Sequence, residues 1–202
     1  MTAISRRNFI KNTGGATLGL WFGISLLDGC VTKKSIAGAN NFTPYILVDR
    51  DNNITIYNIK SELGQGSFQS VRSLIAEEFE VSLDQVKILN SNGEKAFGPH
   101  QSAGGSSSVR GSYNELRKVG ASAKEMLLTA AAAKWGVNAS DCYAESGKVF
   151  HRPSNKSFTY GELIEEASKL DVPKDPKLKD PKDFQLLGKS VPRPDVPMKV
   201  GG

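Results

Sequence analysis

A long stretch of helical periodicity places the strongest constraint on how this chain folds. From residue 108 to residue 135 apolar side chains recur every three or four positions, and the stretch stops at Gly136 after Lys134. Glycine just past the last turn is typical of a helix end, because it adopts the left-handed conformation at little cost. The apolar positions are Val109, Tyr113, Leu116, Val119, Ala123, Met126, Leu127 and Ala130. The sequence therefore predicts that this is the longest helix of the chain.

β-rich runs and a second helix precede that stretch. Residues 45–48 and 54–59 are rich in β-branched and aromatic side chains, and the segment between them has the composition of a hairpin turn. Residues 67–79 carry apolar side chains at helical spacing, and residues 86–89 form a further short β-rich run. These patterns predict two antiparallel strands, a helix and a third strand.

The helix at residues 67–79 is expected to be amphipathic. Its apolar stripe consists of Val71, Leu74, Ile75 and Phe79. Arg72, Glu77 and Glu78 fall on its other sides, where a surface helix carries its charged residues.

A smaller α+β segment follows the long helix. Residues 142–145 and 148–151 read as a hairpin around Ser146 and Gly147. Residues 159–170 read as a helix, and Thr159 followed three positions later by Glu162 predicts a capping box.

The composition changes at residue 171. Six of the nine prolines lie between there and the end, mixed with lysine and aspartate, which predicts an extended arm that becomes ordered on contact. Its apolar residues Phe184, Leu186 and Leu187 imply docking, and we expect later domains of a longer protein to receive them. The predicted fold is α+β, with residues 1–39 as leader, 40–170 as one domain and 171–202 as the arm.

The first residues resemble an export signal. Residues 5–11 read SRRNFIK, which matches the twin-arginine pattern S-R-R-x-F-L-K with one conservative change. The apolar stretch at residues 16–27 that follows is shorter than the roughly 20 residues of a membrane span. An amphipathic helix that happens to begin with two arginines is the alternative. The twin-arginine route exports folded proteins, often loaded with cofactor, so we expect a periplasmic location.

The end of the leader can be read in two ways. Residues 26–30, LLDGC, resemble a lipoprotein box ending at Cys30, which would anchor the chain to the membrane, although Asp28 is unusual there. Ala37-Gly38-Ala39 is a small-residue cleavage site that would release the chain at Asn40. Because of Asp28, cleavage or retention without lipid is the favoured prediction.

Charge and cysteine content exclude two classes of function. The net charge is +5, but the first 42 residues carry five basic residues against Asp28 alone, so the remainder is nearly neutral. No basic stripe or aromatic interleaving marks the remainder, so nucleic acid is not an expected partner. Cys30 and Cys142 lie far apart and form no C-x-x-C pair, so no iron–sulfur cluster is expected in this chain.

Two glycine-bearing segments precede the two long helices. Residues 61–66, SELGQG, lie between a strand and a helix, where glycines let a ligand approach the backbone and helix-start N–H groups favour an anion. Residues 104–111, GGSSSVRG, add three hydroxyls ahead of the long helix. A plain turn in the first segment, and a linker with helix caps in the second, are the alternatives. Neither segment matches a P-loop or a full G-x-G-x-x-G, so an ordinary nucleoside triphosphate is not the expected ligand.

Order and spacing of these motifs carry a resemblance. ELGQG at 62–66, GGSSSVR at 104–110, LKDPKDF at 178–184 and LGK at 187–189 follow the leader in that order. The chain, from about residue 6 to its end, resembles the molybdopterin-binding large subunit of the xanthine dehydrogenase and aldehyde oxidase group, of the isoquinoline 1-oxidoreductase type.

The resemblance implies a cofactor site. In that group the Gly-Gln-Gly loop and the serine-rich segment contact the pterin and phosphates of a molybdenum cofactor, commonly molybdopterin cytosine dinucleotide. The corresponding residues here are Gly64, Gln65, Gly66, Gly105, Ser106, Ser107 and Ser108. We read Gly104 and Gly105 as a site of close backbone approach, and Ser106 to Ser108 as donors at the start of the long helix. Arg110 is left out, since a helix arginine more often faces solvent.

The resemblance also implies a reaction and its partners. Group members insert oxygen from water into a C–H bond of an aldehyde or N-heterocycle, and a small subunit with two [2Fe–2S] clusters receives the electrons. Their catalytic glutamate lies in several hundred further residues, so no catalytic residue is assigned here, and His100 and His151 are isolated. This chain's expected share is cofactor binding. A free-standing exported binding or interaction module without chemistry, and a lipid-anchored structural protein, are the alternatives.

Overall fold

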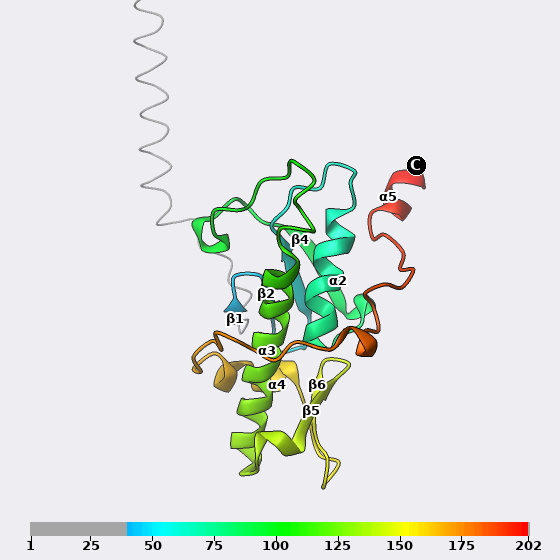
Figure 1. Ribbon diagram of the computed structural model, residues 1–202. Helices are drawn as coiled ribbons and strands as arrows, with labels where there is room; N and C mark the ends of the chain where they lie inside the picture. The colour runs from blue at the N-terminus through cyan, green and yellow to red at the C-terminus, as the bar shows by residue number, and fades with distance from the viewer. Residues whose placement is uncertain (1–39, 202) are drawn as a thin grey trace, which may run out of the picture. The chain divides into compact units, whose positions relative to one another are not determined.

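The computed structural model describes residues 40–201, and side chains from residue 44 onward. The twin-arginine motif, Cys30 and the Ala37-Gly38-Ala39 site lie outside the described residues, so the predictions about them stay predictions. The described residues belong to one compact unit. Figure 1 shows two helices side by side against a sheet, with a smaller sheet at one end of that unit.

The first sheet has the order β1-β2-β3-β4. Its strands are β1 (Asn40–Thr43), β2 (Ile46–Val48), β3 (Ile54–Asn58) and β4 (Val86–Asn90). The predicted hairpin is confirmed, because β2 and β3 pair antiparallel. Helix α2 (Ser67–Phe79) carries the chain from β3 to β4, which pair in parallel, as strands joined by a helical crossover do. Helix α2 has the bounds that the periodicity predicts.

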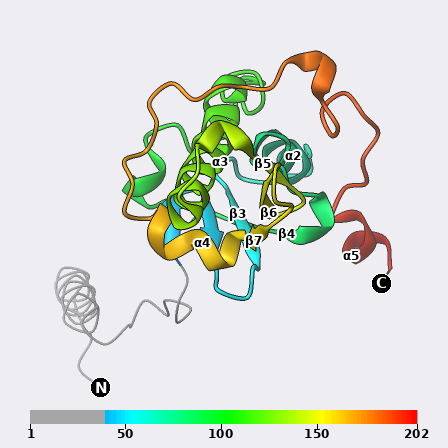
Figure 2. The same ribbon diagram turned by 90° about the horizontal axis from the view of Figure 1, so that it is seen from below.

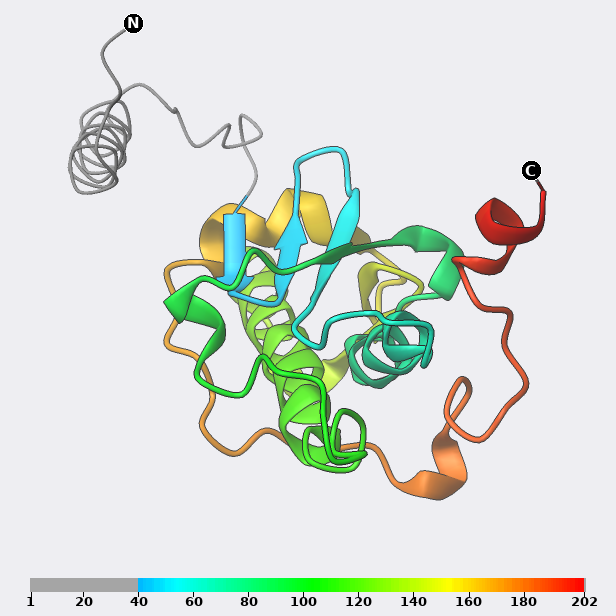
Figure 3. The ribbon, with the colours of Figure 1, turned by 90° about the horizontal axis from the view of Figure 1, so that it is seen from above.

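Helices α2 and α3 (Tyr113–Trp135) pack in parallel. Glu78 pairs with Arg117, and Glu80, which caps the C-terminal end of α2, lies 3.8 Å from Lys124, so both helices run the same way. Gly120 lets them touch, because a Cβ there would lie 2.4 Å from the carbonyl oxygen of Ile75. The segments preceding the two helices therefore lie at the same end of the unit, as Figures 1 and 3 show.

The predicted tail elements are confirmed. A second sheet has the order β5-β6-β7, made of β5 (Cys142–Glu145), β6 (Lys148–His151) and β7 (Ser157–Thr159). Helix α4 (Tyr160–Ala167) begins with a complete capping box between Thr159 and Glu162. The Tyr160 hydroxyl donates a 2.7 Å hydrogen bond to the carbonyl of Phe79, which joins this part to α2.

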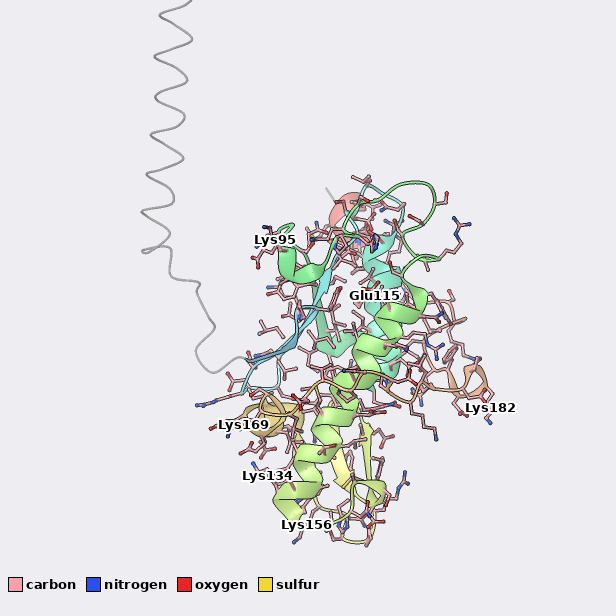
Figure 4. All side chains as sticks on the ribbon, turned by 60° about the vertical axis from the view of Figure 1, so that its left-hand side comes forward. Lys95, Glu115, Lys134, Lys156, Lys169 and Lys182 are labelled. Atoms are coloured by element: carbon pink, nitrogen blue, oxygen red, sulfur yellow. The ribbon has the colours of Figure 1, made fainter. Side chains whose placement is uncertain are left out.

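The expected start of the long helix is wrong by five residues. Helix α3 begins at Tyr113, not at Ser108, because residues 108–112 form successive turns. The Gly111 N–H bonds the carbonyl of Ser107 at 2.8 Å within those turns. Figure 4 labels Glu115 near the start of α3 and Lys134 near its end. None of the helices within residues 40–201 has the length and hydrophobicity needed to cross a bilayer.

The expected polar sides of α2 are also wrong. Arg72, Glu77 and Glu78 are all buried, with 8%, 1% and 0% of their surfaces exposed. The sheet covers one side of α2, α3 covers another, and the C-terminal arm crosses a third. Periodicity detected the apolar stripe of α2, but it does not reveal that charged partners bury the rest of the helix.

The arm, residues 171–201, docks on this chain itself. The carboxylate of Glu77 accepts backbone N–H bonds from Gln185, Leu186 and Leu187 at 2.6–3.1 Å. Leu186 and Leu187 pack against the core, and the Arg117 guanidinium lies 4.9 Å from the Phe184 ring centroid. The expectation that later domains receive these residues is therefore corrected. Figure 2 shows the arm, orange to red, running around α3 and α2 and ending in the short helix α5 (Val196–Val200).

Candidate cofactor-binding site

The Glu62 carboxylate organises the loop before α2. It accepts hydrogen bonds from the backbone N–H groups of Gly64 (2.8 Å), Gly66 (3.1 Å) and Phe68 (2.9 Å), and from the Ser67 hydroxyl (3.1 Å). Gly66 is the N-cap residue and has φ +85°, a conformation that favours glycine. The Glu62 carboxylate therefore occupies the helix start, where the sequence suggested an external anion.

The environment keeps Glu62 ionised. Burial acts to raise the pKa of its carboxyl, but the hydrogen bonds from Phe68, Gly66, Gly64 and Ser67 together outweigh burial and lower it. A carboxylate that accepts several N–H bonds is a fixed negative charge at neutral pH. An acid just before a glycine-bearing helix start is the sequence signal that could have identified this role.

Gln65 and Gly64 are exposed, and Gln65 is engaged within its own loop. Its side-chain oxygen accepts from the N–H of Leu63 at 2.6 Å, and its amide nitrogen donates to the carbonyl of Ser61 at 2.7 Å. Arg193 of the arm donates to the carbonyl of Gly64 at 3.1 Å. In this conformation Gln65 shapes the loop, and a ligand would meet its amide only if these bonds exchanged.

The serine segment forms an exposed turn. The Ser107 N–H and hydroxyl both donate to the carbonyl of Gly104, at 3.1 and 2.8 Å. Gly105 and Ser106, the central residues of this turn, have φ of +57° and +53°. Ser106 is exposed and Ser108 is half-buried. Because α3 begins at Tyr113, neither lies at a helix start, and the expected helix-start N–H contribution of residues 106–108 is withdrawn.

Gly104 has no local reason to be glycine. A Cβ built on it meets nothing within 4 Å, and its φ is not in the positive region that favours glycine. Gly105 differs, since its φ of +57° favours glycine even though the space around it is open. A surface that is open and lacks side chains at 104 and 105 is what close approach of a ligand to the backbone requires.

Lys60 ties the two glycine-bearing segments together. It is 4% exposed and follows β3, and its ammonium group donates to the carbonyls of His100 and, at 3.5 Å, Ser102. Asn58 and Ser67 bind the carbonyl of Lys60 from the other side. Lys60 therefore holds the start of the loop before α2 against the segment that leads into the serine turn. Its role is not visible in the sequence, because an isolated lysine ordinarily lies on the surface.

A family model described as a molybdopterin cofactor-binding domain matches residues 8–193. The chain belongs to this family of molybdopterin cofactor-binding domains. The match covers both glycine-bearing segments and most of the arm, and it confirms the resemblance to the molybdenum hydroxylase group.

Curated relatives are longer than this chain. The molybdopterin-binding chain is 27% identical to the beta subunit of isoquinoline 1-oxidoreductase of Brevundimonas diminuta, over 98% of this chain and 31% of that protein. It is 30% identical to a nicotinate dehydrogenase subunit of Pseudomonas putida KT2440, over 89% of this chain and 16% of that protein. Among solved structures, quinoline 2-oxidoreductase from Pseudomonas putida 86 superposes with a TM-score of 0.48 and 17% identity, over 59% of this chain and 15% of that one.

The donor set of the molybdopterin-binding chain fits a polar, anionic cofactor in part. Open backbone at Gly104 and Gly105 and the Ser106 and Ser108 hydroxyls are available, whereas Gln65 is engaged inside its loop. The imidazole of His151 faces the Ser154 hydroxyl at 2.7 Å. His100 is exposed and lies in the segment that leads into the serine turn. Within residues 40–201 no three His, Cys, Asp or Glu side chains gather as a metal site would require.

Proposed function

We propose that this chain supplies part of the cofactor cradle of an exported molybdenum hydroxylase large subunit. The family match is the observation that carries the proposal, and the two glycine-bearing segments held together by Lys60 support it. The proposed cofactor is molybdopterin cytosine dinucleotide. When bound, it would supply the metal centre at which an aldehyde or N-heterocycle is hydroxylated with oxygen from water. Electrons then leave through a small subunit with two [2Fe–2S] clusters.

The share of this chain is to bind and orient. Gly104 and Gly105 let the ligand reach the backbone, and the hydroxyls of Ser106 and Ser108 donate to its polar atoms. Gly64, Gln65, Gly66 and Ser107 fix the shape of the two loops, since their own hydrogen bonds and backbone conformations define those turns. Glu62 keeps the loop before α2 in one conformation through four hydrogen bonds.

Cofactor content tests the proposal. The gene, including any continuation of its reading frame, is expressed in a molybdenum-cofactor-competent host, and the purified protein is assayed for molybdenum by mass spectrometry and for pterin by fluorescence after oxidation. We expect both in the wild type, and at least a tenfold loss in the double variant Ser106→Val and Ser108→Val. Ser190→Val, a change at an exposed serine of the arm, is the matched control.

Two results would contradict the proposal. A wild-type protein without molybdenum and pterin would leave only a fold-retaining binding module. Normal cofactor content in the double valine variant would remove the serine turn from the site. Export is tested separately, by asking whether Arg6→Lys with Arg7→Lys keeps the protein in the cytoplasm.

A further inference from the structure

A cavity of about 600 Å³ lies between α2, β4 and the end of the arm. Phe68 of α2, Val86 and Ile88 of β4, and Pro194 and Met198 of the arm provide apolar walls. Its volume lies within the 300–1,000 Å³ typical of small-molecule sites, which are mostly apolar with a few polar groups that fix orientation. None of the seven residues assigned to the cofactor lines it.

Arg72 contributes an unpaired buried cation to this cavity. It lines the cavity and is 92% buried, since 8% of its surface is exposed. Its Nε–H is the one buried side-chain nitrogen or oxygen without a hydrogen-bond partner among the residues that the structure describes. The terminal nitrogen Nη2 donates to Gln69 at 2.7 Å, so only part of the guanidinium is satisfied. The guanidinium is therefore a buried cation with incomplete hydrogen bonding, which favours an anion beside it.

The acidic side chains around the cavity are already engaged. Glu62 has its four internal hydrogen bonds, and Asp195 accepts from Arg193 at 3.0 and 2.6 Å and from Lys199 at 2.6 Å. Lys87 of β4 also lines the cavity, as an exposed lysine at its edge. The charges available to an occupant are therefore positive.

Burial lowers the pKa of Arg72, and the negative charge of Asp84 opposes that effect. A guanidinium remains protonated at neutral pH even so. The Arg72 cation thus lies against apolar walls without a counter-ion in hydrogen-bond contact, which is the environment in which a charge-assisted hydrogen bond is strongest.

We propose that this cavity binds a small organic monocarboxylate, with its apolar body against Phe68 and Ile88 and its carboxylate on the guanidinium of Arg72. One buried guanidinium with one lysine at the edge matches a single negative charge. A phosphate dianion would have to lose more hydration than these two groups restore, because the remaining lining is largely apolar. A neutral ligand of the same shape would leave the guanidinium without a counter-ion.

Benzoate and benzamide, which have the same shape and differ in charge, are the probes. Each is titrated into the full chain while the arginine Nε–H and backbone amide resonances are followed by ¹⁵N NMR. We expect saturable shifts of the Arg72 Nε–H and of the amides of β4 with benzoate, and binding at least about tenfold weaker with benzamide, as for loss of one charge-assisted hydrogen bond.

Variants locate the interaction. Arg72→Met, which keeps the length and removes the charge, should weaken benzoate binding at least tenfold, and Lys87→Met should weaken it less. Lys182→Met, a change at a 75% exposed lysine of the arm, should have no effect. If Arg72→Met does not fold, the comparison of benzoate with benzamide on the wild-type protein still tests the proposal.

Three outcomes would overturn the proposal. One is absence of a saturable benzoate shift at Arg72. Another is equal affinity for benzoate and benzamide, which would indicate a purely apolar surface. The third is an Arg72 shift produced by an acidic peptide and not by benzoate, which would assign the cavity to a polypeptide segment.

Discussion

The Glu77 carboxylate and the Lys179 ammonium group form a 2.8 Å ion pair across 102 residues of sequence, and both side chains are almost fully buried. Glu77 lies in α2 and Lys179 in the arm. The same carboxylate also accepts the backbone N–H groups that begin at Gln185. Glu77 is thus the point at which the arm is fixed to the fold.

Replacing Glu77 by Gln should destabilise the chain by about 2–3 kcal/mol. The change removes the negative charge that Lys179 and three backbone N–H groups contact. Lys179 keeps its ion pair with Glu80 at 3.0 Å, so the loss of unfolding free energy is smaller than for an unpaired buried charge. Urea unfolding measures it. Glu165→Gln, whose exposed ion pairs are 3.8 and 3.9 Å long, should change stability by less than about 0.5 kcal/mol. Equal effects of the two variants would contradict the role given to Glu77.

The contribution of Glu77 should depend on pH. Burial acts to raise the pKa of Glu77, but hydrogen bonds from Lys179, Leu187, Leu186 and Gln185 outweigh it, so the folded pKa lies below 4.5. A lowered pKa stabilises the fold above the unfolded value, and that stabilisation is lost as pH falls through the folded pKa. The stability difference between wild type and Glu77→Gln, measured by urea unfolding, should therefore be constant from pH 8 to 6 and shrink below about pH 4.5. A difference that persists unchanged at pH 3 would show that another interaction holds the arm.

Lys60→Met should loosen the segment that leads into the serine turn. The variant keeps the apolar stem of the side chain but removes the charged donor to the carbonyls of His100 and Ser102. We expect the free energy of unfolding to fall by about 1–2 kcal/mol. Hydrogen exchange should become faster within residues 98–112 and stay unchanged in β5 and β6. Lys95→Met, at an exposed lysine nearby, is the control. Unchanged exchange in that segment would mean that Lys60 does not position it.

Gly120→Ala should separate α2 from α3. A Cβ at this position would lie 2.4 Å from the Ile75 carbonyl oxygen and 3.2 Å from the Phe79 nitrogen, both backbone atoms that cannot move alone. Overpacking of this kind costs about 1–3 kcal/mol or more, which outweighs the roughly 1 kcal/mol gained from the helix propensity of alanine. Thermal unfolding measures the loss. Gly104→Ala, a change in open space, is the control, and its free energy of unfolding should stay within about 0.5 kcal/mol of wild type. Destabilisation by Gly104→Ala would indicate a packing role for that glycine.

The sequence predicts the elements of this fold better than it predicts their surroundings. The helix at residues 67–79 and the capping box at residues 159–162 are both confirmed. Both patterns depend only on residues that are close together in the sequence. Glu77 and Lys60 show the limit, because their partners lie 40 to 110 positions away. Val109 shows another limit, since it fits the periodic pattern although residues 108–112 form turns and the helix begins at Tyr113.

Only some features of the candidate site could be predicted from the sequence. The structure shows open space around Gly104 and Gly105, and their contact with a cofactor stays a prediction. The internal bonds of Gln65 do not follow from spacing, because an amide that bonds its own loop has the same one-dimensional pattern as a ligand-binding one.

The connection between α2 and the arm also sets an order of events during synthesis. Glu77 leaves the ribosome about a hundred residues before Lys179, which neutralises it, whereas Arg117, the partner of Glu78, follows after 39 residues. At roughly 5–20 residues per second, α2 exists for on the order of 5–20 s with the Glu77 carboxylate lacking its cationic partner. The nascent chain can form the hairpin, the helices and the small sheet in that interval, but the fold closes only when the arm arrives.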